Sequence, residues 1–292
     1  MATVIRTPKD YRTNAAPWWC PGCGDFGVLR ALQEAAAKLN LAPENVVLVA
    51  GIGCSGKIGD YFRSYSVHTV HGRTMPVATG IKLANRNLTV IAAGGDGDGY
   101  GIGLNHFIHA VRRNIDITYI VMDNHIYGLT KGQFSPTSAQ GFKTTSSPAG
   151  TADRPVKPLQ LALAAGVTYL AQAFSSYPDH MAEIIAEAIQ HKGFSLVNCI
   201  SPCVTYNKVN TYDFYKENLV NLDEDPDYDP RNYDLAVETV RKYDELVIGR
   251  IYINDSQPSY QDLLPGYAEE PLVQARLEYE PEHWQEILKE FA

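Results

Sequence analysis

The chain has 292 residues, 45% of them hydrophobic, which is enough apolar material for a large domain with its own core. Its net charge of -8 disfavours nucleic acid or an anionic membrane as the main partner, because both attract basic surfaces. No apolar run of about 18 residues is present and the N-terminus has no signal-peptide core, so a cytoplasmic protein is expected. In that reducing compartment, the five cysteines are not expected to form disulfides.

Strands and helices are predicted to alternate after an irregular arm over residues 1–19. The first helix is predicted to begin at Asp25, as its N-cap. The alternation predicts a doubly wound, mostly parallel α/β sheet, and a long polar loop is expected over 125–150. The predicted strands are 46–50, 88–93, 115–122, 167–171 and 194–200, and the predicted helices after the first are 75–85, 100–112, 158–165 and 178–191.

The composition changes after residue 207. Residues 210–234 are crowded with Tyr, Asp, Asn and Pro, and they precede a predicted helix (234–245), a strand (247–254) and a last helix from Pro281. This part has too little apolar sequence for a core of its own. We therefore predict a main domain over 1–207 and an irregular C-terminal extension over 208–292 that packs on the domain or on a partner.

Two polar residues follow neighbouring strands of the predicted sheet. Asp96 stands among glycines after one strand, and Asn124 follows the next. The carboxyl ends of parallel strands share one edge of a sheet, so both side chains are expected there. Carboxylate and amide oxygens suit magnesium, and the glycine backbone suits a phosphate. The spacing therefore predicts a magnesium and phosphate site.

Four cysteines lie in predicted loops. Cys20 and Cys23 form a C-x-x-C, Cys54 follows the first strand, and Cys203 follows the last strand of the alternating region. If these loops open on one edge of the sheet, the four thiolates can converge beside the magnesium site and hold either zinc or a [4Fe-4S] cluster. The fifth, Cys199, lies within a predicted strand and is expected to be a buried thiol.

Two other patterns are less specific. The glycines from Gly51 to Gly56 fit G-x-G-x-x-G, but no acidic residue follows at the distance that nicotinamide-binding folds use. His106 and His109, three apart on a predicted helix, have the spacing of metal ligands, although such a pair is more often a packing face.

Six motifs together resemble the β subunit of 2-oxoacid:ferredoxin oxidoreductases, and the Asp96 to Asn124 spacing resembles the diphosphate motif of thiamine-diphosphate enzymes. The resemblance spans about residues 15–207 and is nearest to the 2-oxoglutarate type. In chain order the motifs are Trp19-Cys20-Pro-Gly-Cys23-Gly24, Gly51-Ile-Gly-Cys54-Ser-Gly-Lys57, His71-Gly-Arg73, Gly95-Asp-Gly97, Asp123-Asn124 and Ser201-Pro-Cys203.

The resemblance implies the ligands of each cofactor. One [4Fe-4S] cluster is expected on Cys20, Cys23, Cys54 and Cys203. Magnesium is expected on Asp96, Asn124 and the carbonyl of Ile126. Lys57, His71 and Arg73 are the candidates for catalytic contact with the substrate, and Lys131, in the long polar loop, is a further candidate for substrate contact. The positions expected to line thiamine diphosphate are Ile52, Gly53, Cys54, Ser55, His71, Gly95, Gly97, Asp98, Gly128 and Leu129.

The reaction implied is the oxidative decarboxylation of a 2-oxo acid, with coenzyme A accepting the acyl group and a cluster passing single electrons to ferredoxin. The expected conversion is 2-oxoglutarate to succinyl-CoA, reversible as reductive carboxylation; pyruvate or a broad range of 2-oxo acids is the alternative. The glutamate that activates thiamine diphosphate is missing, so an α subunit with the pyrimidine-binding domain is implied, in an αβ heterodimer or a dimer of heterodimers. The chain alone is expected to be inactive.

Two rival functions fit part of the pattern. A non-oxidative thiamine enzyme explains Asp96 and Asn124 but has no need of four cysteines in loops. A non-catalytic electron-transfer or zinc-stabilised module explains the cysteines but leaves Asp96 and Asn124 without a role.

Overall fold

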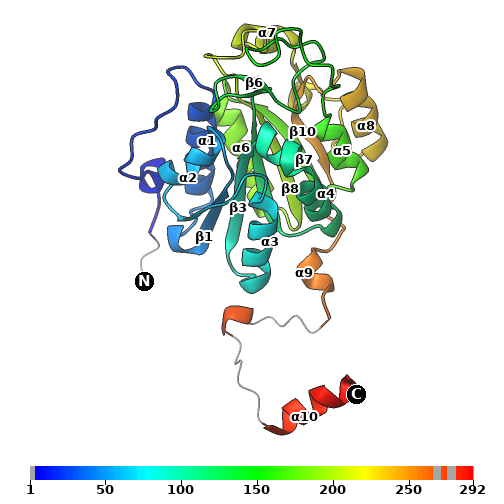
Figure 1. The fold of residues 1–292 in the computed structure, drawn as a ribbon. Coiled ribbons are helices and arrows are strands. Elements are labelled where there is room, and N and C mark those ends of the chain that lie inside the picture. The colour runs from blue at the N-terminus through cyan, green and yellow to red at the C-terminus, as the bar shows by residue number, and fades with distance from the viewer. Residues whose placement is uncertain (1–3, 266–270, 275–280, 292) are drawn as a thin grey trace.

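An eight-stranded sheet organises the molecule, in the order β2-β1-β3-β4-β8-β7-β10-β9 (Figure 1). The computed structural model describes residues 4–265, 271–274 and 281–291. Every pairing in the sheet is parallel except that of β10 with β7. The strands are β1 (Val46–Ala50), β2 (Tyr65–His68), β3 (Thr89–Gly95), β4 (Ile117–Asp123), β7 (Tyr169–Phe174), β8 (Phe194–Ile200), β9 (Val220–Asn221) and β10 (Val247–Ile253), and a separate hairpin pairs β5 (Ile126–Tyr127) with β6 (Gln133–Phe134).

Helices cover both faces of the sheet, which confirms the doubly wound fold class. On one face α1, α2 and α6 pack on the strands, and on the other α3, α4, α5 and α8 do so. No helix of the described ranges has both the length and the apolarity to cross a membrane. The helices are α1 (Asp25–Lys38), α2 (Ile58–Tyr61), α3 (Thr74–Ala84), α4 (Leu104–Arg113), α5 (Pro158–Ala164), α6 (Pro178–Gln190), α7 (Tyr212–Asn218), α8 (Tyr233–Lys242), α9 (Tyr260–Leu263) and α10 (Pro281–Glu290).

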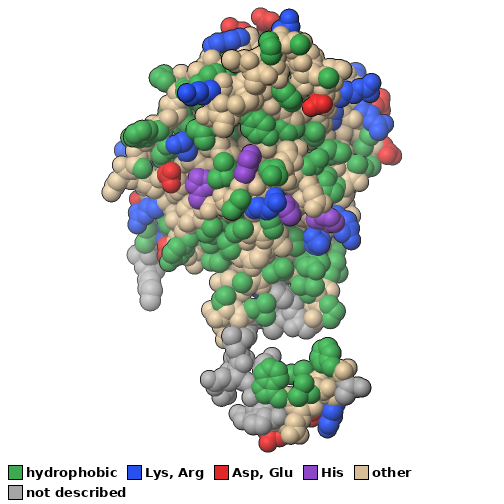
Figure 2. Space-filling model, viewed as in Figure 1, with side chains coloured by type: hydrophobic (Ala, Val, Ile, Leu, Met, Phe, Trp, Pro, Cys, Tyr) green, Lys and Arg blue, Asp and Glu red, His purple; other side chains and the backbone are tan. Residues whose placement is uncertain are grey.

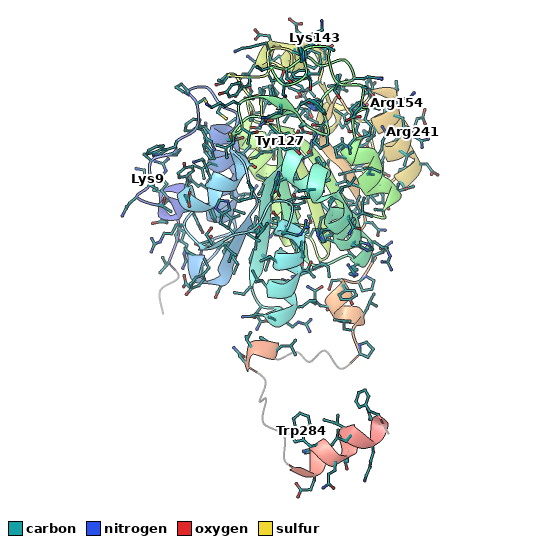
Figure 3. The ribbon with its side chains drawn as sticks, in the orientation of Figure 1. Lys9, Tyr127, Lys143, Arg154, Arg241 and Trp284 are labelled. Carbon is teal, nitrogen blue, oxygen red and sulfur yellow. The ribbon has the colours of Figure 1, made fainter. Side chains whose placement is uncertain are left out.

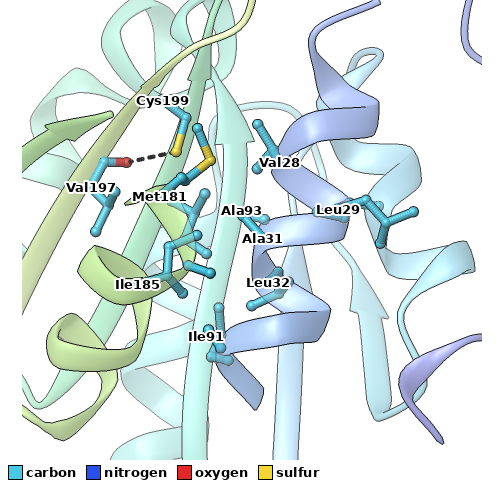
Figure 4. Close-up of a cluster of buried hydrophobic side chains, with 14 of the residues drawn as sticks. Val28, Leu29, Ala31, Leu32, Ile91, Ala93, Met181, Ile185, Val197 and Cys199 are labelled. Atoms are coloured by element: carbon cyan, nitrogen blue, oxygen red, sulfur yellow. Dashed lines mark hydrogen bonds between the residues drawn. The ribbon is translucent and has the colours of Figure 1, made fainter. Parts of the chain in front are cut away.

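Cys199 belongs to the core beneath α1 and α6. It is fully buried, and its thiol lies 3.8 Å from the Val197 carbonyl, among Val28 of α1 and Met181 of α6 (Figure 4). Burial raises the pKa of this thiol well above its ordinary value. The prediction of a buried thiol at this position is confirmed.

The segment beyond residue 207 contributes two strands to the same sheet. The buried residues Val247, Ile248 and Ile251 of β10 close the sheet against β7, and β9 pairs in parallel with β10. Much of the predicted extension therefore shares the core of the main domain, while the boundary at residue 207 stays a prediction. The final helix α10 lies away from this body (Figure 1).

Two local predictions were wrong, and two short strand features were missed. Asp25 is the first residue of α1 rather than its N-cap, which is Gly24, because the Asp25 carboxylate is buried and bonded to Ser201. The helix predicted over 100–112 begins at Leu104, after a π-helical turn that the glycine-rich sequence allows, and this leaves Ile102 56% exposed. The predicted polar loop contains the β5–β6 hairpin, and the edge strand β2 was missed because its side chains are exposed.

Glu245 carries a pH-dependent cost. Burial raises the pKa of its carboxyl to about 7, from 4.5, although it accepts a hydrogen bond from the Gln160 backbone N–H at 3.0 Å. The folded state then holds a proton that the unfolded state releases, so stability falls as the pH rises from about 4.5 to 7. We expect Glu245→Gln, which keeps the acceptor, to raise the free energy of unfolding at pH 8 by about 1–3 kcal/mol and to change it little at pH 4.5. Urea unfolding at both pH values measures this; an equal effect at both would contradict it.

Candidate functional site

Asp96 and Asn124 lie at the same edge of the sheet, as the sequence predicted. Strands β3 and β4 pair in parallel with Gly95 opposite Met122, so both chains leave the sheet side by side. Asp96 is 2% exposed, and its Oδ2 accepts a hydrogen bond from Thr137 Oγ1 at 2.6 Å. Thr137 comes from the loop after β6 and also lies 3.1 Å from Asp123 Oδ1. Nothing in the local sequence of Thr137 indicated this position.

The electrostatics of Asp96 favour a bound cation. Burial, and then the charge of Asp123, raise the pKa of Asp96 to about 6. Across the described residues no lysine or arginine forms an ion pair with Asp96. A buried carboxylate without a basic partner is costly unless a cation offsets its charge.

Asn124 and Ile126 form a tight turn beside this carboxylate. The Asn124 side-chain oxygen accepts the Ile126 N–H at 3.0 Å, and the Asn124 carbonyl accepts the Asn207 amide, also at 3.0 Å. His125, between them, has a positive φ of 55°. The turn keeps two oxygen-bearing residues near Asp96, and hard oxygen donors of this kind fit magnesium.

Asp98 is a hub for two loops. Its Oδ1 accepts the backbone N–H groups of Ile52 (2.9 Å) and Gly72 (2.8 Å), and its Oδ2 accepts Thr74 Oγ1 at 3.0 Å. The side chain is completely buried. Asp98 thus fixes the loop after β1 and the loop before α3 against the turn after β3. The sequence did not predict this bonding role of Asp98.

Removing the Asp98 carboxylate leaves buried donors of both loops without an acceptor, and each such donor costs about 1–3 kcal/mol. We expect Asp98→Ala to lower the free energy of unfolding by about 3 kcal/mol or more. Asp153→Ala, at an exposed loop position, is the control and is expected to change it by less than about 0.5 kcal/mol. Denaturant unfolding of both variants tests this, and equal stabilities would refute the role of Asp98.

His71 is oriented by the same carboxylate. Its Nδ1 lies 2.9 Å from Asp98 Oδ1, and because an ionised carboxylate only accepts, Nδ1 donates. In the neutral ring Nε2 is then an acceptor. The imidazole is partly exposed, and its ring centroid lies 6.2 Å from that of Tyr127, with the two ring planes at 87°.

The other predicted contact residues are more spread out. Arg73 stands at the N-cap position of α3, two residues after His71, without a side-chain capping bond, and Lys57 lines a cavity formed by the cysteines. Lys131 is exposed with a positive φ of 74°. The structure therefore places Lys57 beside the cysteines, and Arg73 at the start of α3, near His71 only along the chain.

The predicted glycines leave little room for side chains. A Cβ at Gly97 would lie 2.1 Å from the ring of Tyr127, whose hydroxyl donates to the Gly97 carbonyl at 3.1 Å, and a Cβ at Gly95 would lie 3.0 Å from Ser55 Oγ. Tyr127 sits over the carboxyl ends of the strands (Figure 3). Gly53 has a φ of +125°, which favours glycine.

Four cysteines line one cavity of about 170 Å³. Cys20, Cys23, Cys54 and Cys203 contribute to it from three separate segments. A Cβ at Gly128 would lie 3.5 Å from the Cys203 sulfur and 3.7 Å from that of Cys54, which are ordinary contact distances, so Gly128 borders both sulfurs. Among the described residues no carboxylate lines the cavity, and four thiols without carboxylates fit a soft metal or an iron–sulfur cluster. The remaining lining residues are Trp18, Trp19, Lys57, Asn124, Gly128, Leu129, Val204, Thr205 and Tyr206.

The cysteine cavity adjoins the Asp96 site, because Asn124 lines the cavity and also forms the turn beside Asp96. Burial raises the pKa of Cys54 to about 12, with a further contribution from the charge of Asp25. Among the described residues no group of three or more His, Cys, Asp or Glu is already arranged to hold a metal ion. His106 and His109 lie on α4, where His109 contacts Arg112.

Comparisons with known proteins match nearly the whole chain. Residues 35–199 match the family described as thiamine pyrophosphate enzyme, C-terminal TPP binding domain, and residues 203–269 match the family of the C-terminal part of the pyruvate ferredoxin oxidoreductase beta subunit. The chain is 44% identical over 277 residues to 2-oxoacid:ferredoxin oxidoreductase 1, subunit beta, of Aeropyrum pernix, covering 90% of this chain and 87% of that protein. The chain belongs to the family of 2-oxoacid:ferredoxin oxidoreductase β subunits.

Two further similar proteins carry names that specify 2-oxoglutarate. The 2-oxoglutarate synthase subunit KorB of Archaeoglobus fulgidus is 45% identical over 209 residues, covering 71% of this chain and 78% of that protein. The structure of 2-oxoglutarate:ferredoxin oxidoreductase from Magnetococcus marinus, with 2-oxoglutarate, coenzyme A and succinyl-CoA bound, matches with a TM-score of 0.89 and 38% identity, covering 97% of this chain and 96% of that one.

Membership of this family confirms the resemblance and makes the chain an oxidoreductase subunit with a thiamine pyrophosphate-binding domain. The nicotinamide dehydrogenase and the non-catalytic module are excluded as alternatives. The glycine pattern that suggested a nicotinamide site lies in the loop after β1. In this loop the Ile52 backbone N–H donates a hydrogen bond to Asp98.

Proposed function

We propose that this chain acts with an α subunit to catalyse the coenzyme A-acylating oxidative decarboxylation of 2-oxoglutarate to succinyl-CoA, and that it passes electrons singly to ferredoxin. The observation that carries this proposal is the adjacency of two sites. The cavity of Cys20, Cys23, Cys54 and Cys203 includes Asn124, which belongs to the turn beside the buried carboxylate of Asp96.

The four cysteines are the ligands of one [4Fe-4S] cluster in this proposal. Their thiols come from loops at one edge of the sheet, and no carboxylate competes in the lining. A cluster beside the carbon that loses carbon dioxide gives a one-electron path, which ferredoxin requires.

Asp96, Asn124 and the Ile126 carbonyl hold magnesium in this proposal, and the cation offsets the buried charge of Asp96. Thiamine diphosphate, when bound, supplies an electron sink for decarboxylation. The chain itself orients and encloses the cofactor in this proposal. Asp98 fixes the loop after β1 and the loop before α3, and the turn from Gly97 offers backbone N–H groups to the diphosphate. The other cofactor contacts of the proposal are Ile52, Gly53, Cys54, Ser55, His71, Gly95, Gly128 and Leu129.

His71 is the candidate for direct contact with substrate, because Asp98 orients its ring and leaves Nε2 free to accept or carry a proton. Lys57 and Arg73 supply positive charge near the site, Lys57 from the cysteine cavity and Arg73 from the start of α3. Positive charge suits an anionic 2-oxo acid.

A partner at this edge of the sheet is supported by exposed apolar side chains. Val70 (75%), Ile102 (56%) and Leu129 (50%) project from the loops that carry the proposed site residues. Figure 2 shows hydrophobic side chains interspersed with histidines and with Lys or Arg on one face. Exposed apolar groups beside a site favour a docking surface, and the α subunit is the partner we assign to it.

The substrate assignment rests on the relatives named for 2-oxoglutarate and on the structure that holds 2-oxoglutarate, coenzyme A and succinyl-CoA. The test is ferredoxin reduction by the co-purified α and β subunits with pyruvate, 2-oxobutyrate and 2-oxoglutarate, each with and without coenzyme A. We expect kcat/KM to be at least tenfold higher for 2-oxoglutarate than for the other acids. A preference for pyruvate would overturn the substrate assignment. If no 2-oxo acid gave thiamine-dependent activity, the proposed reaction would be overturned.

A further inference from the structure

Two of the three segments that carry the four cysteines are joined by hydrogen bonds that use no cysteine sulfur. Ser201 Oγ donates to Asp25 Oδ1 at 2.5 Å, and the Gly24 N–H donates to the Pro202 carbonyl at 3.2 Å. These two bonds join the start of α1, just after Cys23, to the loop that leads into Cys203. We call this contact the Asp25–Ser201 clamp; it consists of Gly24, Asp25, Ser201 and Pro202.

The clamp is closely packed. Asp25 and Ser201 are both completely buried. A Cβ at Gly24 would lie 2.6 Å from Ser201 Cα, so the two backbones meet at a distance that only glycine permits. The separation between the Cys23 and Cys203 segments is therefore set by the protein.

The second oxygen of Asp25 has no hydrogen-bond partner in the described part of the chain, although it is buried. None of the described lysines or arginines forms an ion pair with this carboxylate. Asp25 is two residues from Cys23, so this buried carboxylate lies next to the segment that carries two of the four thiols. A buried carboxylate held this way needs a reason, since it costs stability.

We propose that Asp25 is a positioning residue of the cysteine site: it holds the Cys203 loop against the Cys23 segment through Ser201, and it places a fixed negative charge behind the sulfurs that makes the cluster harder to reduce. This inference rests on the proposed [4Fe-4S] cluster. Reduction adds one negative charge to a cluster, and a nearby buried carboxylate opposes that addition with little screening. Charge and hydrogen bonding around the sulfurs are two means by which a protein sets a cluster's potential.

Two variants separate the two roles of Asp25. Asp25→Asn keeps an oxygen that accepts from Ser201 but removes the charge, while Ser201→Ala removes the bond and keeps the charge. The matched controls are Ser195→Ala, which loses a buried hydroxyl bond of 2.8 Å in the neighbouring strand β8, and Asp234→Asn, which removes an exposed charge on α8.

The experiment uses the αβ complex purified anaerobically. In a redox titration, electron paramagnetic resonance monitors the cluster signal that Cys203→Ala abolishes. In a second measurement, the rate of cluster loss is determined after addition of an iron chelator. We expect Asp25→Asn to make reduction at least tenfold more favourable, which is a midpoint about 59 mV more positive for one electron. We expect Ser201→Ala to lose its cluster at least threefold faster, and both controls to match the wild type.

Each contrary outcome has a distinct meaning. An Asp25→Asn midpoint equal to that of Asp234→Asn overturns the electrostatic role. If Ser201→Ala loses its cluster at the same rate as Ser195→Ala, the positioning role is overturned. The comparison of these two serine variants also tests the proposal if Asp25→Asn assembles no cluster. A wild-type complex that has no signal dependent on Cys203 overturns the proposed function, and the inference with it.

Discussion

Cys203→Ala is expected to lower ferredoxin reduction by the αβ complex at least 100-fold and to leave thiamine diphosphate binding within about twofold. Cys203 lines the cysteine cavity with Cys20, Cys23 and Cys54, and its removal leaves three thiols for a cluster that uses four. Thiamine diphosphate does not need this sulfur, because the oxygens assigned to its magnesium come from the turn beside Asp96.

The control for this variant lies four residues earlier. Cys199→Ala removes a thiol that is completely buried under α1 and α6, outside the cavity. It is expected to keep the visible spectrum of the cluster and most of the activity, with a stability cost of about 1 kcal/mol. The measurements are iron content, visible absorbance and the rate of ferredoxin reduction. Equal effects of the two variants would contradict the assignment of Cys203.

Asp96→Ala is expected to weaken thiamine diphosphate binding in the presence of magnesium by at least about 100-fold while the cluster is retained. The only carboxylate assigned to the metal is lost, and its neighbour Thr137 cannot replace it because a hydroxyl carries no charge. The apoprotein is not expected to be less stable, since burial makes ionised Asp96 costly. Isothermal titration with thiamine diphosphate and magnesium measures the change.

The Asp96 and Cys203 variants serve as reciprocal controls. Asp96→Ala must keep the iron and the visible absorbance that Cys203→Ala loses, and Cys203→Ala must keep the cofactor affinity that Asp96→Ala loses. Undiminished thiamine diphosphate binding in Asp96→Ala would refute the magnesium site.

The regular part of the fold was predictable from the sequence because its strands are apolar and end in glycine or polar residues. The bounds of β1 and β8 agree with the predicted ranges, and the parallel pairing of β3 with β4 follows from the helix between them. Strand β2 was not predicted, because it has only four residues and its apolar side chains, Tyr65 and Val67, are exposed rather than buried. The broken helix after Gly97 depends on a glycine-rich turn that has no helical periodicity.

The proposed ligand residues could be predicted from the sequence, but the residues that hold them in place by hydrogen bonds could not. Asp96, Asn124 and the loop cysteines stand at strand ends, and that position predicted that they meet. The roles of Thr137, Asp98 and Asp25 depend on loops that approach from distant parts of the chain. For Asp25 local helix statistics suggested an N-cap, whereas its carboxylate bonds to a residue 176 positions away.

The most direct test of a thiamine site coupled to a cluster is the visible spectrum of the anaerobic αβ complex before and after addition of 2-oxoglutarate, with the Cys203→Ala complex as reference. We predict a brown wild-type complex whose Cys203-dependent absorbance is partly bleached by 2-oxoglutarate, and only when thiamine diphosphate and magnesium are bound. A zinc-loaded site without that absorbance, or an absorbance that 2-oxoglutarate leaves unchanged, would contradict the account.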